Sequence, residues 1–134
     1  MTDFYHQSFF DLDISYSIII EDDGSVAYAY LLKDEKIVGD VWLYNQGIAP
    51  AVVDWKNKDV PFLNPSVFLL SERTIAPIKK ESDFNIKWTL ENQKVQANIY
   101  IRGALIACLK PGDFPGFSTL VCKDGPLAKA LLMP

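Results

Sequence analysis

The chain has 134 residues and a mass of 15.1 kDa, the size of one domain with a sizeable core, so we expect a single domain, 1–134. Its net charge is −4, and its only adjacent basic pair, Lys79-Lys80, precedes Glu81 and Asp83. Because nucleic-acid binding depends on basic patches, this charge argues against nucleic acid and anionic membrane as partners. No apolar run approaches the roughly 20 residues that span a bilayer, and the N-terminus lacks the features of a secretory signal. We therefore expect a cytoplasmic protein.

The first part of the chain predicts three antiparallel strands. Segments 12–20, 26–32 and 36–44 alternate apolar and polar residues with the period of two that is typical of strands. A three-residue loop at 22–24 is favoured because it joins the first two apolar rows on one face, and a two-residue turn is expected at 34–35. The expected pairs are Ile20 with Val26, Ile18 with Tyr28, Leu32 with Ile37, Tyr30 with Gly39, Tyr28 with Val41 and Val26 with Leu43.

The clearest hairpin joins 84–91 to 94–101 through a two-residue turn. It places complementary charges opposite each other on the solvent face, which stabilises the pairing. The expected pairs are Phe84 with Ile101, Ile86 with Ile99, Trp88 with Ala97, Leu90 with Val95 and Glu91 with Lys94, with Asp83 near Arg102. Arg102-Gly103 is then either a second turn, which pairs Ile99 with Ile106 and Ala97 with Cys108, or a bulge in one long strand.

The remaining segments complete the predicted fold. Residues 119–123 read as a short last strand, and the helix formers after Pro126 predict a short C-terminal helix. The proline-rich segment 45–82 holds half of the chain's 8 prolines and is expected to cross between sheets, either as a core plug or as a binding surface. The N-terminus, 1–11, is expected to be mobile. We predict an all-β fold, either an antiparallel β-sandwich or an up-and-down β-barrel, of about seven strands.

Two sets of aromatic and polar residues suggest binding sites. The first lies on the second face of segment 36–44 and in the proline-rich segment, and it predicts a partner- or ligand-binding surface because aromatics with polar tips are enriched at interface hot spots. Its members are Asp40, Trp42, Tyr44, Trp55, Phe62 and Asn64. The alternative for the strand face is partial cover by the proline-rich crossover. The second set would line a cup for an apolar ligand, since a dry core avoids hydroxyl groups; it comprises Tyr16, Tyr28, Tyr30 and Trp88.

Catalytic and metal chemistry has little support in the sequence. His6 is the only histidine and lies before the first predicted strand, and no nucleophile elbow, P-loop or dinucleotide motif is present. The carboxylate pairs Asp11/Asp13 and Asp22/Asp23 are read as the start of a strand and as a turn. We therefore predict no catalytic residue, metal or cofactor. Cys108 and Cys122 are expected to be small buried residues, with a disulfide between neighbouring strands as the alternative.

Three functions follow from these patterns. The first is a non-catalytic protein-interaction module, acidic and soluble, whose partner is a basic protein or a second copy of the chain. Immunity proteins, which neutralise a toxin at its basic active site, share this general profile. The second is a β-barrel or cup that holds a small apolar ligand. The third is a hydrolase that uses carboxylates or His6.

Overall fold

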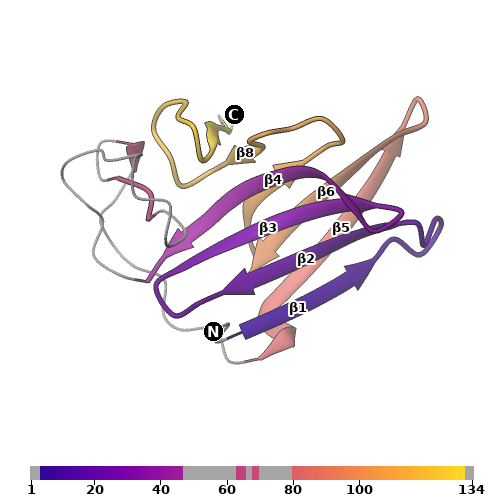
Figure 1. Ribbon diagram of the computed structural model, residues 1–134, viewed down its shortest axis with the longest axis horizontal. Coiled ribbons are helices and arrows are strands. Elements are labelled where there is room, and N and C mark those ends of the chain that lie inside the picture. The colour runs from indigo at the N-terminus through magenta and orange to yellow at the C-terminus, as the bar shows by residue number, and fades with distance from the viewer. Residues whose placement is uncertain (1–3, 47–62, 66–67, 70–79, 132–134) are drawn as a thin grey trace.

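The computed structural model describes residues 4–46, 63–65, 68–69 and 80–131, which form two sheets in a sandwich-like arrangement (Figure 1). The all-β prediction is confirmed, and the sheets do not close into a barrel. The described residues contain nine strands rather than about seven, because residues 4–9 also form a strand and two strands of two residues each lie near the end of the chain. Most of the proline-rich segment 45–82 lies outside the described residues.

The first sheet has four antiparallel strands in the order β1-β2-β3-β4. The strands are β1 (Phe4–Phe9), β2 (Tyr16–Asp22), β3 (Val26–Lys33) and β4 (Lys36–Asn45). β1 corrects the expectation of a mobile N-terminus, because residues 4–9 pair along their whole length with β2. The inner face carries aliphatic side chains that are fully buried, among them Ile18, Ile20, Ala29, Leu31 and Val41. Their burial against the second sheet is the main stabilising contribution.

The register of β2 and β3 differs from the prediction. Ile20 pairs with Ala29 rather than Val26, because the turn lies later in the chain than expected, at 23–25 between β2 and β3 instead of 22–24. The side chain of Asp23 accepts hydrogen bonds from the backbone N–H groups of Ser25 and Val26, which stabilises the turn at this later position. The partner of Ile20 is therefore three residues from the expected one, and an odd displacement exchanges the two faces of β3. The row Tyr28, Tyr30 and Leu32 faces the outside of the sandwich, and the row Ala27, Ala29 and Leu31 faces the inside.

The turn between β3 and β4 is confirmed as a two-residue turn at Asp34-Glu35, with both residues at positive φ (52° and 69°). The pair of Leu32 with Ile37 is also confirmed. A register shift then follows, so that Tyr30 pairs with Asp40 rather than Gly39, and Tyr28 with Trp42 rather than Val41. A second shift lies between Ala27 and Tyr28. Such bulges place one extra residue in one strand and are difficult to infer from the apolar pattern.

The second sheet has five strands in the order β5-β6-β7-β8-β9, and its last pair is parallel. The strands are β5 (Phe84–Glu91), β6 (Lys94–Ile101), β7 (Ala104–Leu109), β8 (Phe117–Ser118) and β9 (Lys129–Ala130), and the 3-10 helix η2 (Glu81–Asp83) precedes them. Every predicted pair of the β5–β6 hairpin is confirmed. The predicted charge pair is present too, with Arg102 Nη2 3.7 Å from Asp83 Oδ2.

Beyond this hairpin the predictions hold in part. The tight turn at Arg102-Gly103 is confirmed, but a register shift pairs Ile99 with Ala107 rather than Ile106, and Ala97 with Leu109 rather than Cys108. The expected last strand at 119–123 is wrong, since β8 ends at Ser118.

The described part of the predicted C-terminal helix is not helical, because its backbone finds sheet partners. β9 pairs with β8, and the N–H of Lys129 donates to the carbonyl of Gly116 at 2.9 Å.

The chain after β7 also covers the free edge of β4. The N–H of Asp40 donates to the carbonyl of Asp113 at 2.9 Å, and its own carbonyl accepts from the N–H of Gly116 at 2.7 Å. Further along, the N–H of Trp42 donates to the carbonyl of Leu127 at 3.0 Å. These bonds satisfy edge groups that would otherwise be open to another strand. The edge of the first sheet at β4 is therefore covered at Asp40 and Trp42.

Candidate functional site

The outward side of the first sheet presents an ordered array of twelve side chains, here called the outer face. In Figure 1 this side of the sheet is turned toward the viewer, with the second sheet behind it. The register places the side chains in three rows that run across all four strands. The rows are Tyr5-Glu21-Tyr28-Trp42, Gln7-Ile19-Tyr30-Asp40 and Phe9-Ser17-Leu32-Ile37.

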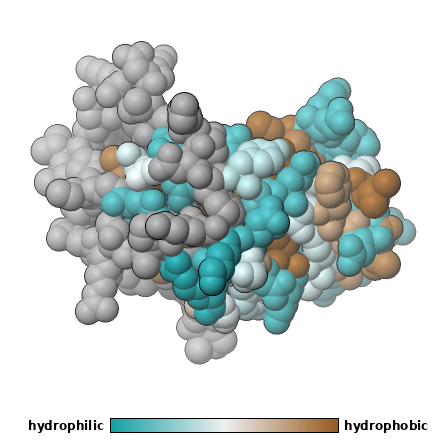
Figure 2. All heavy atoms as spheres, turned by 90° about the horizontal axis from the view of Figure 1, so that it is seen from below, coloured by the Kyte–Doolittle hydropathy of each residue, from teal (hydrophilic) through white to brown (hydrophobic). Residues whose placement is uncertain are grey.

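The outer face combines apolar, aromatic and acidic side chains. Its twelve positions include two carboxylates, Glu21 and Asp40, and no lysine or arginine. Tyr5, Phe9 and Ile37 are 50%, 51% and 55% exposed, which is unusual for side chains of their size. Figure 2 views the molecule from below and not onto the outer face, and it shows hydrophobic side chains interspersed with hydrophilic ones at the end farthest from the grey atoms. Exposed apolar and aromatic side chains that gather on one face mark a candidate contact site.

Asp40 lies on β4, at the end of the middle row of this array. Tyr30 stands directly opposite it on β3, and the Tyr30 ring stacks on Tyr28 with the ring centroids 6.5 Å apart and the planes 20° apart. Burial raises the pKa of Asp40, and within the described residues no cation contributes to that shift. Burial raises the pKa of both tyrosines as well, and the negative charges of Asp40 and Asp23 add to the effect. Among the described residues, the surroundings of Asp40 therefore have a negative potential.

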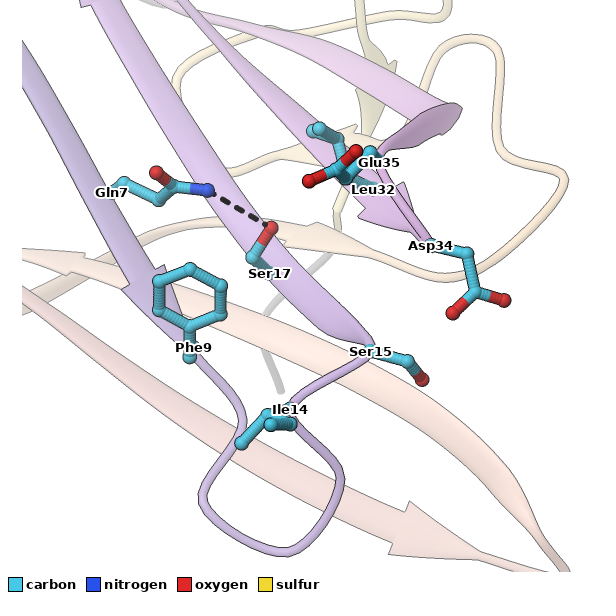
Figure 3. Close-up of a pocket in the computed structure, with 8 residues that line it drawn as sticks. All are labelled: Gln7, Phe9, Ile14, Ser15, Ser17, Leu32, Asp34 and Glu35. Carbon is cyan, nitrogen blue, oxygen red and sulfur yellow. Dashed lines mark hydrogen bonds between the residues drawn. The ribbon is translucent and has the colours of Figure 1, made fainter.

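A depression of about 590 Å³ lies at the end of the outer face that is nearest the β3–β4 turn (Figure 3). Phe9 and Leu32 belong to its wall, and Gln7 donates a hydrogen bond from Nε2 to Ser17 Oγ at 3.4 Å across it. Its remaining lining residues come from the two adjacent connections, and they are Ile14, Ser15, Asp34 and Glu35. The lining of the depression thus combines apolar side chains with amide, hydroxyl and carboxylate groups, and it does not include Asp40.

The predicted recognition residues do not form one exposed surface. Trp42, Tyr44 and Asn64 are 2%, 1% and 2% exposed, which corrects the expectation of a partly open face at Trp42 and Tyr44. The register shift between Ala27 and Tyr28 also places Trp42 and Tyr44 on opposite faces of the sheet. Of the predicted set, Asp40 alone lies half-buried on the outer face; Trp55 and Phe62 lie outside the described residues.

Two of these buried residues belong to one hydrogen-bond network around Asn45. The Oδ1 atom of Asn45 accepts from Trp42 Nε1 and from the N–H of Asn64, both at 2.8 Å. Its Nδ2 donates to the carbonyl of Asn64 at 2.9 Å. Because buried polar groups need such partners, the network fastens the end of β4 to the described residues of the proline-rich segment. Its role is structural.

The four predicted cavity residues do not surround a common space. Tyr28 and Tyr30 lie on the outer face, whereas Trp88 belongs to β5 and stacks on Phe10 with centroids 5.3 Å apart. Tyr16 lies beneath Lys33, whose Nζ is 4.2 Å from the ring centroid. The cup built from these four residues is therefore not formed. Tyr28 and Tyr30 instead join Asp40, which the sequence pattern had assigned to a different site.

The residue that the sequence offered for catalysis, His6, makes contacts that support the fold. His6 lies in β1, where its ring stacks on Phe84 and its Nδ1 is 3.5 Å from a Glu81 oxygen. The described residues include no cluster of His, Cys, Asp and Glu suited to a metal ion. None of their helices is long and apolar enough to cross a membrane. Cys108 is buried as predicted, whereas Cys122 is exposed, which corrects the expectation of a buried residue, and no disulfide joins the two.

Comparison of the chain with protein-family models, with curated proteins and with solved structures found no match. The site is therefore defined by its own geometry. The sequence reasoning missed Tyr5, Phe9, Glu21 and Ile37, because it assigned Tyr5 and Phe9 to a mobile terminus and set the β2–β3 register by the apolar rows. The alternation of Tyr5, Gln7 and Phe9 is the signal that could have revealed β1.

Proposed function

We propose that this chain is a non-catalytic protein-interaction module that binds a basic partner protein through the outer face. The observation that carries the proposal is the composition of that face, where exposed aromatic and aliphatic side chains surround two carboxylates and no basic residue is present. Aromatic anchors supply most of the energy at protein interfaces, while complementary charge guides the approach and selects the partner.

A basic partner fits this face better than a second copy of the chain. In a symmetric dimer the same patch of both copies would meet, so Glu21 and Asp40 of each copy would oppose an equally acidic surface. Like charges opposed across an interface oppose association. A partner with lysine or arginine side chains would instead be attracted, and the negative net charge of −4 would accelerate its approach at low salt.

A matched pair of substitutions tests the proposal. Phe9 on the outer face and Leu90 on β5 are 51% and 53% exposed, so their replacement by alanine removes comparable surface from different sheets. A partner captured by the wild-type chain at low salt should bind Phe9→Ala about tenfold more weakly, because an interface anchor is lost. It should bind Leu90→Ala as well as the wild type. Equal affinity for all three proteins, or equal loss in both variants, would overturn the use of the outer face.

A further inference from the structure

We propose that Tyr28, Tyr30 and Asp40 form a receptor for one arginine side chain of the partner. The proposal rests on the proposed function and names the chemistry of its central contact. The guanidinium group would lie against the tyrosine rings and donate to the carboxylate of Asp40. The occupant is an arginine of a basic protein, selected by the charge of the site.

The geometry of the three residues is suited to such a group. The Tyr28 and Tyr30 rings are stacked at 6.5 Å with only 20° between their planes, and Asp40 lies opposite Tyr30 on the neighbouring strand. A planar cation can therefore meet an aromatic surface and a carboxylate from one direction. Strands β3 and β4 hold the three residues, so the arrangement is rigid before any partner arrives, which reduces the entropic cost of binding.

The surroundings of the three residues are negatively charged, and no cation among the described residues pairs with Asp40. Among the salt bridges of the described residues none involves Asp40, and burial is the cause of its raised pKa. Glu21 and Asp23 add to the negative potential at Tyr30. A partly buried carboxylate without a counter-ion is costly, and an incoming cation removes that cost.

The same chain shows how this combination of groups is completed elsewhere. At the end of the first sheet, Lys33 Nζ lies 4.2 Å from the centroid of the Tyr16 ring and 3.8 Å from Asp13 Oδ2. There a tyrosine ring and a carboxylate hold a cation that the chain itself supplies. Tyr30 and Asp40 offer the same two groups on the outer face, where the twelve positions contain no basic residue.

Arginine fits this site better than lysine does. Its guanidinium group is planar and weakly hydrated, so it stacks on aromatic rings and donates two parallel hydrogen bonds to a carboxylate. An ammonium group is strongly hydrated and acts as a point charge, so it gains less from two stacked rings. The expected order of affinity is therefore arginine, then lysine, then the neutral isostere citrulline.

A titration with small probes tests the site without the partner. The probes are N-acetyl-arginine amide, N-acetyl-lysine amide and N-acetyl-citrulline amide, added to the full chain at low salt and followed by amide NMR shifts. The arginine probe should shift Tyr28, Tyr30 and Asp40 and bind about tenfold more tightly than the citrulline probe. Asp40→Asn and Tyr30→Leu should each abolish that preference, whereas Asp13→Asn should preserve it because Asp13 is paired with Lys33.

Two results would overturn the arginine site. One is a set of shifts spread over all acidic residues, and the other is equal binding of the lysine and arginine probes. Neither result affects the Phe9→Ala test, so the interaction module would stand without this contact. Conversely, specific arginine binding together with an unaffected Phe9→Ala variant would support the site and reject the wider interface.

Discussion

The two faces of the first sheet each carry an aspartate beside a tyrosine, in very different states. On the inner face the Asp22 carboxylate accepts a hydrogen bond from Tyr44 Oη at 2.7 Å and another from the N–H of Gly24 at 2.8 Å, and both side chains are buried. On the outer face Asp40 is half-buried opposite Tyr30, and it has no ion pair among the described residues.

The difference shows how the same residue types serve two purposes. The inner pair completes its hydrogen bonds within the fold, so it stabilises the end of the β2–β3 hairpin and offers nothing to a partner. In the outer pair the Asp40 carboxylate is partly desolvated, and no cation among the described residues pairs with it. This state is unfavourable for folding and favourable for binding a positive group. We therefore expect substitutions in the two pairs to change stability in opposite directions.

The largest expected effect is at Asp22. Asp22→Ala removes the acceptor for the buried Tyr44 hydroxyl and for the N–H of Gly24, so the free energy of unfolding should fall by about 3 kcal/mol. Urea denaturation followed by tryptophan fluorescence measures this change. Asp11→Ala, at an exposed turn position without a positive φ, is the control and should change stability by less than about 0.5 kcal/mol. A change at Asp22 no larger than that of the control would refute the structural role.

A second comparison removes only a hydroxyl group from each face. Tyr44→Phe leaves the buried Asp22 carboxylate with one hydrogen bond fewer and should lower the unfolding free energy by about 2 kcal/mol. Tyr30→Phe keeps the ring on the half-buried outer face and should alter stability by less than about 0.5 kcal/mol. Thermal unfolding of the two variants under the same conditions measures the difference between their stabilities. Equal shifts of the unfolding temperature would mean that the two hydroxyl groups contribute equally to stability.

These contrasts also explain which features the sequence could reveal. The β5–β6 hairpin was predicted pair by pair, because its apolar rows, its charge pairs and its turn length all favour one register. In the β2–β3 hairpin the apolar rows favoured a loop at 22–24, while the Asp22 and Asp23 side chains stabilise a turn that lies later, at 23–25. Local turn hydrogen bonds decided the register there, and alternating Ala and Tyr residues gave no clear inner face.

The candidate site could be predicted from the sequence only in part, for the same reason. Asp40 was identified because a carboxylate next to Trp42 is conspicuous on a strand. Its actual neighbours, Tyr28 and Tyr30, depend on the register shift after Leu31, which no periodic pattern encodes. The burial of Trp42 depends on the chain near Leu127, more than eighty residues later, whose backbone pairs with β4.

The smallest effect has the opposite sign and concerns Asp40. Since burial raises the pKa of Asp40 in the folded protein above its ordinary value of 3.8, the folded state holds that proton more tightly than the unfolded state does. The stability contributed by this group is therefore present at acid pH and is lost as the pH rises above the ordinary value. Asp40→Asn, which cannot ionise, should be more stable than the wild type at pH 7, by less than about 1 kcal/mol because the carboxylate is only half-buried.

Denaturation of both proteins across the pH range measures this difference. The advantage of Asp40→Asn should shrink as the pH falls toward 3.8, where the wild-type carboxyl group is protonated as well. Glu91→Gln, at an exposed position on β5, provides the control and should show no such trend. An Asp40→Asn protein that is less stable than the wild type at pH 7 would mean that this carboxylate supports the fold, as Asp22 does. A more stable variant with weaker arginine binding would instead mean that the outer face keeps an unfavourable charge for the sake of contact.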